Sequence, residues 1–410
     1  MLYEAYEPFR LWLEPIAELA KLTAAALENT SWPVQRFVRA NSALLNRLTR
    51  TYSKPEFAID RCVAHGREVA VIEEVIETRP FCRLVRFSRK TDDAALATTL
   101  AHDPRVLLCA PLSGHYATLL RDTITTLLGD HDVYVTDWAN ARDVPIADGT
   151  FDLADYVAYI RAFIANLGAR ELHVISVCQP TVPVLAAVSL DAAAGAPTPR
   201  TLTLMGGPID ARQSPTQVNQ FATEHDLAWF ERNMIHRVPS RYAGIGRRVY
   251  PGFIQLTAFV QMNAGRHAEA YRAYWFDALR GDTAATAVHE RFYDEFNAVL
   301  DMDAGYYLDT VRTVFQEFGL ARGTWEIGGE LVRPSALRDI AILTVEGDRD
   351  DISGLGQTAA AHDLCTNVPA AHKHHLLAAD CGHYGIFSGH HWREQVYPRV
   401  RDLIRSGAAS

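Results

Sequence analysis

Two short apolar runs, together with the residues directly after them, constrain this chain more than any other feature. Residues 106–111 and 173–177 each read as a buried strand. The second run leads straight into the turn 178–180 and then into an apolar helical stretch over 181–190. Such a turn presents its first side chain, that of Cys178, at the edge of a sheet, and the helix start supplies unpaired N–H groups and positive potential. Both conditions favour a thiolate and an oxyanion beside it.

Strand patterns recur along the chain with helical patterns between them. The expected strands are residues 69–72, 82–87, 106–110, 133–136, 172–177, 201–205, 340–345 and 374–377, and the clearest helices are 152–167 and 181–194. Alternation of this kind predicts an α/β fold, with a mostly parallel sheet covered by helices on both faces.

Between residues 208 and 334 the alternation stops and aromatic residues accumulate. This stretch predicts a helical cap inserted between two strands of the sheet, and an aromatic cap over a nucleophile would suit an apolar substrate. The expected organisation has four parts: an N-terminal helical segment at 1–55, the first part of the core at 56–209, the cap at 210–335 and the second part of the core at 336–410.

Residues 2–50 carry a helical pattern, with an apolar stripe that begins at Leu2, Tyr6, Phe9 and Leu13. Two interpretations are open. The helix packs on the protein's own core or on a dimer partner, which would make the protein a homo-oligomer, or it lies on the surface of a hydrophobic particle.

The composition excludes several classes of protein. A net charge of −9 without any Lys/Arg run argues against nucleic acid as a partner. The 6 cysteines show no CxxC spacing, which favours reduced thiols in the cytoplasm over a disulfide framework. The acidic start does not resemble a secretory signal, and no stretch approaches the roughly 20 apolar residues of a transmembrane segment.

Three chemical groups occur along the chain in an informative order. Cys178 ends its strand, the strand at 340–345 leads into the acidic turn 346–353, and the final strand leads to His383. Nucleophile, acid and base occur in this order in α/β hydrolases. In such a set the imidazole accepts the thiol proton and later protonates the leaving group, while the carboxylate orients the imidazole.

Three carboxylates compete for the role of the acid. Asp348, Asp350 and Asp351 all lie in the acidic turn. The run 350–352, Asp-Asp-Ile, resembles the Asp-His-Ile that follows this strand in related hydrolases, which favours Asp350, with Asp351 left open. His383 is the candidate base because glycines on both sides of it would let a loop carry it towards the nucleophile.

The other thiols and histidines are assigned structural roles. Cys109 lies inside a strand and is expected in the core, and Cys381 lacks a strand-to-helix setting. A group of histidines near the C-terminus has no carboxylate or thiol to complete a ligand set, so no metal site is expected. These histidines are His372, His374, His375, His390 and His391.

An oxyanion hole requires two N–H groups. The first is expected from Gln179, directly after the nucleophile, and the second from the loop 111–115. Since proline has no N–H, the candidates in that loop are Leu112 and Ser113. Ser176 and Pro180 replace the two glycines of the Gly-x-Ser-x-Gly pattern, but a proline in the first helical turn costs little.

Over nearly its whole length the chain resembles the intracellular polyhydroxyalkanoate (poly(3-hydroxybutyrate)) depolymerases, which are α/β hydrolases with a cysteine nucleophile. By this resemblance the triad falls on Cys178, Asp350 and His383. The segments that carry it are residues 1–6, 111–119, 177–180, 344–353 and 381–387.

The resemblance implies thiolysis of the polyester of storage granules, followed by attack of water on the acyl-enzyme. The products would be 3-hydroxybutyrate oligomers or monomer, no cofactor is implied, and the enzyme would be cytoplasmic and granule-associated.

The residues also bear on rival functions. Polyhydroxyalkanoate synthases share the triad order but resemble Gly-x-Cys-x-Gly at the turn, so Ser176 and Pro180 favour hydrolysis. A non-catalytic granule-coating protein is disfavoured by the complete triad, and a hydrolase of small soluble esters stays open.

Overall fold

The protein is represented by a computed structural model that describes residues 15, 19, 22 and 32–408. The apolar stripe expected from residue 2 onwards lies outside the described residues, apart from Leu19, which is exposed. The helix expected up to residue 50 is confirmed over α2 (Trp32–Thr49), and the chain then runs without regular structure to the first strand.

The described part of the chain contains one 9-stranded sheet, in the order β1-β2-β3-β5-β4-β6-β7-β13-β14. The six strands from β5 to β14 are parallel, and β1, β2 and β3 form an antiparallel extension beside β5. The strands are β1 (Arg61–Ala64), β2 (Arg67–Arg79), β3 (Cys82–Lys90), β4 (Arg105–Cys109), β5 (Asp132–Trp138), β6 (Leu172–Val177), β7 (Thr201–Met205), β13 (Ala341–Gly347) and β14 (Lys373–Ala378).

Each predicted strand is present, and the expected mostly parallel α/β fold is confirmed with them. Every residue of β5, β6 and β7 is buried, as continuous apolar runs in a sheet covered on both faces require. The prediction missed β1, because its 4 residues alternate between buried and exposed and include a charged side chain.

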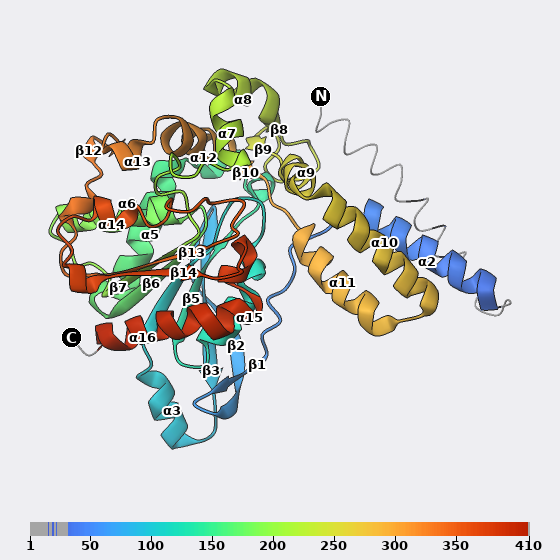
Figure 1. Cartoon of the computed structure of the whole chain (residues 1–410), viewed down its shortest axis with the longest axis horizontal. Helices are drawn as coiled ribbons and strands as arrows, with labels where there is room; N and C mark the ends of the chain where they lie inside the picture. Colours follow the sequence, from blue (N-terminus) through green and yellow to red (C-terminus); the bar gives the residue numbers. More distant parts are fainter. Residues whose placement is uncertain (1–14, 16–18, 20–21, 23–31, 409–410) are drawn as a thin grey trace.

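Helices cover both faces of the parallel strands (Figure 1). From β4 the chain crosses to β5 in one direction, and from β5 it crosses back past β4 to β6, so right-handed crossovers place α4 and α5 on opposite faces. The predicted helices are confirmed as α5 and α6, which pack against each other. The core helices are α3 (Ala94–Ala101), α4 (Arg121–Leu127), α5 (Leu153–Leu167), α6 (Thr181–Ala193), α14 (Ala361–Leu364), α15 (Gly389–His391) and α16 (Tyr397–Ala408).

The stretch between β7 and β13 is mainly helical, as predicted, with short strand pieces that the sequence did not indicate. The division into core and cap at the expected boundaries stays a proposal. The helices are α7 (Gln217–Glu224), α8 (Leu227–Met234), α9 (Gly252–Met262), α10 (Ala264–Arg280), α11 (Thr283–Phe296), α12 (Ala304–Thr310) and α13 (Gly319–Arg322), and the strand pieces are β8 (His236–Arg237), β9 (Arg248–Tyr250), β10 (Met302–Asp303), β11 (Glu326–Ile327) and β12 (Glu330–Leu331).

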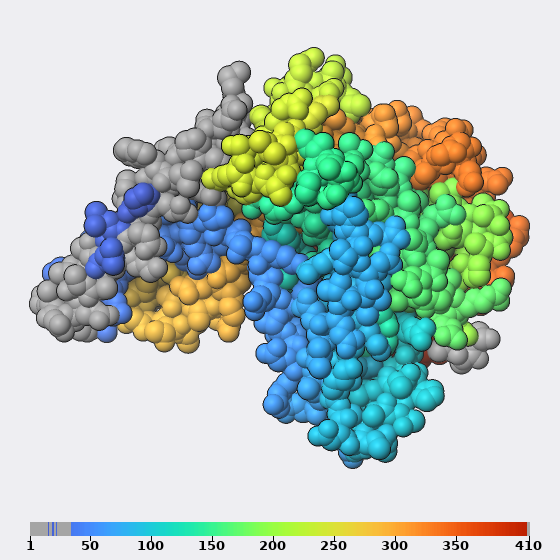
Figure 2. Space-filling view, turned by 180° about the vertical axis from the view of Figure 1, so that it is seen from behind, coloured from blue at the N-terminus to red at the C-terminus, as the bar shows by residue number. Residues whose placement is uncertain are grey.

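Part of this insertion does not cover the sheet. Helices α10 and α11 pack with α2 into an arm that stands to one side of the body in both views (Figures 1 and 2). Several of its aromatic residues contact one another, such as Phe37 with Trp275 at 6.1 Å and Tyr271 with Tyr293 at 4.6 Å between ring centroids. The aromatic residues of this part therefore serve helix–helix packing within the arm, and a cap over the nucleophile stays a prediction for the insertion.

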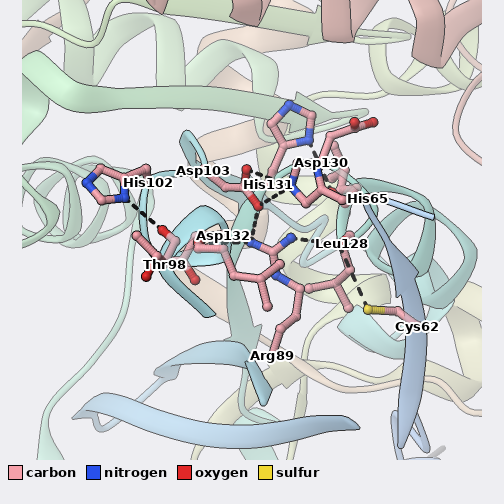
Figure 3. A network of polar contacts seen from close by, with 12 residues as sticks. Cys62, His65, Arg89, Thr98, His102, Asp103, Leu128, Asp130, His131 and Asp132 are labelled. Carbon is pink, nitrogen blue, oxygen red and sulfur yellow. Dashed lines mark hydrogen bonds and ion pairs between the residues drawn. The ribbon is translucent and has the colours of Figure 1, made fainter. Parts of the chain in front are cut away.

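A polar network lies at the amino ends of the parallel strands (Figure 3). The buried Arg89 forms an ion pair of 2.8 Å with Asp103 and donates a hydrogen bond of 3.0 Å to the carbonyl of Leu128. His65, in the turn between β1 and β2, lies 3.0 Å from the same Asp103 carboxylate. This network ties the antiparallel extension to the body. Within the described residues, no helix is long and apolar enough to cross a membrane.

We predict that the protein loses stability on acidification, because three of its histidines are buried. Burial lowers the pKa of His115, His131 and His173 to about 4 each. A histidine in the unfolded chain has a pKa near 6.5, so the unfolded state takes up a proton at each of these positions before the folded state does. Above that pH the free energy of unfolding is unaffected, and as the pH falls towards 4 each histidine lowers it by up to about 3 kcal/mol. We expect the urea concentration at the midpoint of unfolding to be lower at about pH 5 than at about pH 7.

The variant His173→Phe serves to isolate this effect. It keeps an aromatic ring in the core and removes one group that must take up a proton on unfolding, at the loss of a hydrogen bond of 2.9 Å to Thr201. The dependence of its midpoint on pH should be shallower than that of the parent. An equally steep dependence in both proteins would contradict the prediction.

Candidate active site

Cys178 occupies a strained turn at the carboxyl edge of the sheet. It lies between β6 and α6 with a φ of 66°, in the left-handed region that non-glycine residues rarely adopt. Its N–H donates to the carbonyl of Met205 at 2.7 Å, and its own carbonyl accepts from the N–H of Thr181 at 3.1 Å. The side chain is partly buried, so the turn holds a sulfur at the edge of the core and leaves it accessible.

Two glycines after β7 make this turn possible. A Cβ atom on Gly207 would lie 1.8 Å from Oγ1 of Thr181 and 2.5 Å from the carbonyl oxygen of Cys178. Gly206 has a φ of 56°, and a Cβ there would lie 3.3 Å from the imidazole of His383. The sequence prediction missed this requirement, although a Gly-Gly pair directly after a predicted strand was visible.

The carboxylate of Asp350 orients the imidazole of His383. Asp350 follows β13, His383 follows β14, and Nδ1 of the histidine lies 2.7 Å from Oδ2 of the aspartate, with both side chains buried. The other oxygen of Asp350 accepts hydrogen bonds from the N–H groups of Ile352 and Ser353, at 2.9 and 2.8 Å. Asp351 is exposed, and its carboxylate lies 3.4 Å from the amide of Asn263 instead.

The imidazole also forms a hydrogen bond with Cys178. Burial lowers the pKa of His383. The charges of Cys178 and Asp350 and the hydrogen bonds to both raise it by more, so the pKa lies well above its ordinary value. This environment favours an imidazolium beside the sulfur of Cys178, an arrangement that suits a cysteine nucleophile.

A second buried carboxylate fixes the loop beyond Asp350. Glu346, the last-but-one residue of β13, accepts hydrogen bonds from the N–H groups of Gly356, Thr358 and Ala359, at 3.1, 2.8 and 2.9 Å. The hydroxyl of Thr358 in turn accepts from the N–H of Gly207 at 2.8 Å. Glu346 therefore links the loop that carries Asp350 to the glycines beneath Cys178, a role that the sequence did not reveal.

The residues predicted for the oxyanion hole lie at the same edge of the sheet. Leu112 and Ser113 follow β4, the neighbour of β6, and Gln179 follows Cys178. In the part of the chain that the structure describes, no hydrogen bond occupies the N–H groups of these three residues. The loop turns at Gly114, with a φ of 88°, and its carbonyl accepts from the N–H of Leu300 at 2.9 Å.

The aromatic residue Tyr306 was not singled out by the sequence prediction. It lies on α12, is fully buried, and its hydroxyl has no hydrogen-bond partner among the described residues. Burial raises the pKa of Tyr306, and the charge of Cys178 adds to this effect. As one aromatic residue among the many in the insertion, it carried no distinguishing signal in the sequence.

Cys109, the thiol expected in the core, is fully buried in β4. Cys381, for which the sequence indicated no strand-to-helix setting, is also buried, and burial raises its pKa to about 11. Across residues 32–408 and the few described before them, no group of three His, Cys, Asp or Glu side chains is arranged to hold a metal ion.

A cavity of about 450 Å³ lies at the joint between the arm and the body. None of the predicted site residues lines it. Its walls come from the end of α2, from α9 and α10, and from residues near α11, among them Tyr52, Phe253 and Tyr271.

The strand order, the turn at Cys178 and the positions of Asp350 and His383 define an α/β hydrolase. Residues 206–408 match the family described as PHB de-polymerase C-terminus, and this part of the chain belongs to that family. A comparison with curated proteins found no match.

Several solved structures resemble that of the chain, although their sequence identity to it is low. A 2-hydroxy-6-oxo-6-phenylhexa-2,4-dienoate hydrolase from Rhodococcus sp. strain RHA1 is 14% identical, with a TM-score of 0.44, and the match covers 82% of this chain and 99% of that one. Naproxen esterase from Bacillus subtilis is 12% identical, with a TM-score of 0.39 and coverage of 92% and 98%. The esterase RhEst1 from Rhodococcus sp. ECU1013 is 15% identical, with a TM-score of 0.44 and coverage of 82% and 98%.

We predict that Gly207→Ala disrupts the turn at Cys178. The added methyl group would overlap Thr181 and the backbone of Cys178, and such overpacking costs about 1–3 kcal/mol. Urea unfolding and the rate of alkylation of Cys178 by iodoacetamide should both report the change. Gly265→Ala is the control, because a Cβ there meets nothing within 4 Å. Parent-like stability and alkylation in Gly207→Ala would contradict the prediction.

Replacement of the two neighbouring aspartates should have different effects on the reactivity of the Cys178 thiol. In Asp350→Asn the imidazole loses the negative charge that raises the pKa of His383, so the imidazolium is no longer maintained near the sulfur. Alkylation of Cys178 at about pH 6, followed by peptide mass spectrometry, should slow about tenfold or more. Asp351→Asn should react within about twofold of the parent. Equal effects of the two substitutions would show that Asp350 has no special role.

Proposed function

We propose that this chain is an intracellular poly(3-hydroxybutyrate) depolymerase that hydrolyses the polyester of storage granules to 3-hydroxybutyrate oligomers or monomer. Cys178 is the nucleophile, His383 the base and Asp350 the carboxylate that orients it. The observation that carries the proposal is the contact of His383 with both partners, including the 2.7 Å distance to Asp350, in a chain whose second half belongs to the PHB depolymerase family.

The first half-reaction forms an acyl-enzyme. The imidazole of His383 holds the proton of the thiol, and the thiolate of Cys178 adds to the carbonyl carbon of the ester. The negative oxygen accepts hydrogen bonds from the N–H of Gln179 and from that of Leu112 or Ser113. When the intermediate collapses, the carbon–oxygen bond of the ester breaks and the imidazolium protonates the departing alcohol.

The second half-reaction releases the acid. His383 takes a proton from water as the water oxygen adds to the thioester carbonyl, and collapse breaks the carbon–sulfur bond. The carboxylic acid product leaves and the thiol is restored. Each cycle consumes one water and one ester bond and requires no cofactor.

The polymer and the granule surface are the proposed partners, and the cytoplasm is the proposed location. The family to which residues 206–408 belong supports the polyester as substrate. The free state of the six cysteines, all of which lie in the described part of the chain, supports a reducing compartment.

The decisive experiment compares variants on native amorphous granules. Parent protein should reduce the turbidity of a granule suspension and release 3-hydroxybutyrate, and Cys178→Ala should lower the rate by at least about 10³-fold because no acyl-enzyme can form. Cys365→Ala, which removes a buried thiol that none of the proposed steps uses, should keep the parent rate within about twofold.

The same preparation distinguishes the rival functions. Incubation with hydroxyacyl-CoA that yields polymer and free CoA would identify a synthase. Clearance of granules by Cys178→Ala at the parent rate would refute the cysteine mechanism.

A further inference from the structure

The buried hydroxyl of Tyr306 requires an explanation. Its side chain is 0% exposed, and in the part of the chain that the structure describes its oxygen has no hydrogen-bond partner. Buried hydroxyls are nearly always paired, because an unpaired one costs about 1–3 kcal/mol. An unpaired buried hydroxyl can gain its hydrogen-bond partner from a bound ligand.

A stack of aromatic rings fixes the position of Tyr306. Its ring stacks on that of Tyr156 with 5.5 Å between centroids, and Tyr156 stacks on Trp138 at 4.3 Å. The indole of Trp138 donates a hydrogen bond of 2.9 Å to the carbonyl of Ala110, and the hydroxyl of Tyr156 lies 3.5 Å from the same oxygen. The stack is therefore anchored on the residue that precedes the loop 111–115.

The sheet places this stack beside Cys178. Cys109 in β4 is paired with Ser176 in β6, so Ala110 and the turn at Cys178 lie next to each other at the ends of adjacent strands.

The strand order shows on which side of the sulfur Tyr306 lies. Strands β4 and β5, to which the aromatic stack is attached, are on one side of β6, and β7, β13 and β14 are on the other. His383 and Asp350 come from the loops after β14 and β13. Tyr306 is thus on the side opposite to the imidazole, together with the free N–H groups of the loop 111–115 in the described chain.

We propose that the hydroxyl of Tyr306 donates a third hydrogen bond to the oxyanion that forms when Cys178 adds to the ester carbonyl. This inference rests on the proposed function. The phenol keeps its proton throughout, so no bond other than the hydrogen bond is made or broken by it. A preorganised donor that is unpaired in the resting enzyme gains its partner only as charge develops on the carbonyl oxygen, which lowers the barrier without strengthening ground-state binding.

The variant Tyr306→Phe tests the proposal because it keeps the ring and removes the donor. On a soluble p-nitrophenyl ester of a 3-hydroxybutyrate oligomer, we expect kcat to fall about 10- to 100-fold with KM within about twofold. Tyr307→Phe is the matched control. Tyr307 is the next residue on α12, and its ring stacks on Tyr250 at 4.0 Å, away from the aromatic stack. It should keep the parent kcat.

Alkylation of Cys178 by iodoacetamide separates two roles of the hydroxyl. Alkylation forms no oxyanion, so Tyr306→Phe should react at the parent rate across the pH profile. A slower or shifted profile would mean that Tyr306 stabilises the thiolate instead, and would overturn the proposal. Unfolding by urea adds a further criterion. Removal of an unpaired hydroxyl should leave stability unchanged or higher, and a clear loss would reveal a structural partner and also overturn it.

The failure of this inference differs from the failure of the proposed function. If Cys178→Ala is inactive on the soluble ester and Tyr306→Phe matches the parent, the third donor is refuted and the depolymerase proposal stands. If Cys178→Ala keeps the parent activity, the cysteine mechanism fails, and the role of Tyr306 fails with it.

Discussion

The left-handed backbone of Cys178 is the constraint on which the rest of the site depends. A non-glycine residue in this conformation costs on the order of 1–3 kcal/mol, and it persists only where its surroundings enforce it. Here the enforcement comes from the carbonyl of Met205 at the end of β7, from the first turn of α6, and from the absence of side chains at Gly206 and Gly207. The strain serves to present the sulfur at the edge of the sheet.

A chain of direct contacts connects this turn to Asp350 and His383. Gly207 is hydrogen-bonded to Thr358, and Thr358 to Glu346, whose carboxylate gathers the loop that carries Asp350. Asp350 then holds the imidazole of His383. The loops after β7, β13 and β14 are thus one hydrogen-bonded unit under the sulfur, and a displacement in any of them would alter the distance between thiol and imidazole.

Much of the fold was predictable, because fully buried parallel strands require apolar runs and the helices between them have their own period. The candidate triad was also predictable in part, since the order of Cys178, an acidic turn and His383 is visible in the chain. The choice between Asp350 and Asp351 was not, because successive residues of a turn point in different directions and only packing shows which one is buried. Asp350 is buried against His383, and Asp351 is exposed. The roles of the aromatic residues in the insertion were also not predictable. Aromatic residues at helical spacing can stabilise a helix pair or line a site, so the sequence could not distinguish those of the arm from Tyr306.

The two sides of the sulfur are built by different parts of the chain. The loops of the core supply His383 and Asp350 on one side. On the other side the loop 111–115 depends on the insertion, since Gly114 accepts a hydrogen bond from Leu300 and His115 packs 5.4 Å from Phe259 of α9. Because Tyr306 also belongs to the insertion, the groups proposed to meet the developing negative charge are positioned largely by the insertion, while the groups proposed to move protons are positioned by the sheet. Such a division allows the insertion to change with the substrate while the proton-transfer geometry stays constant.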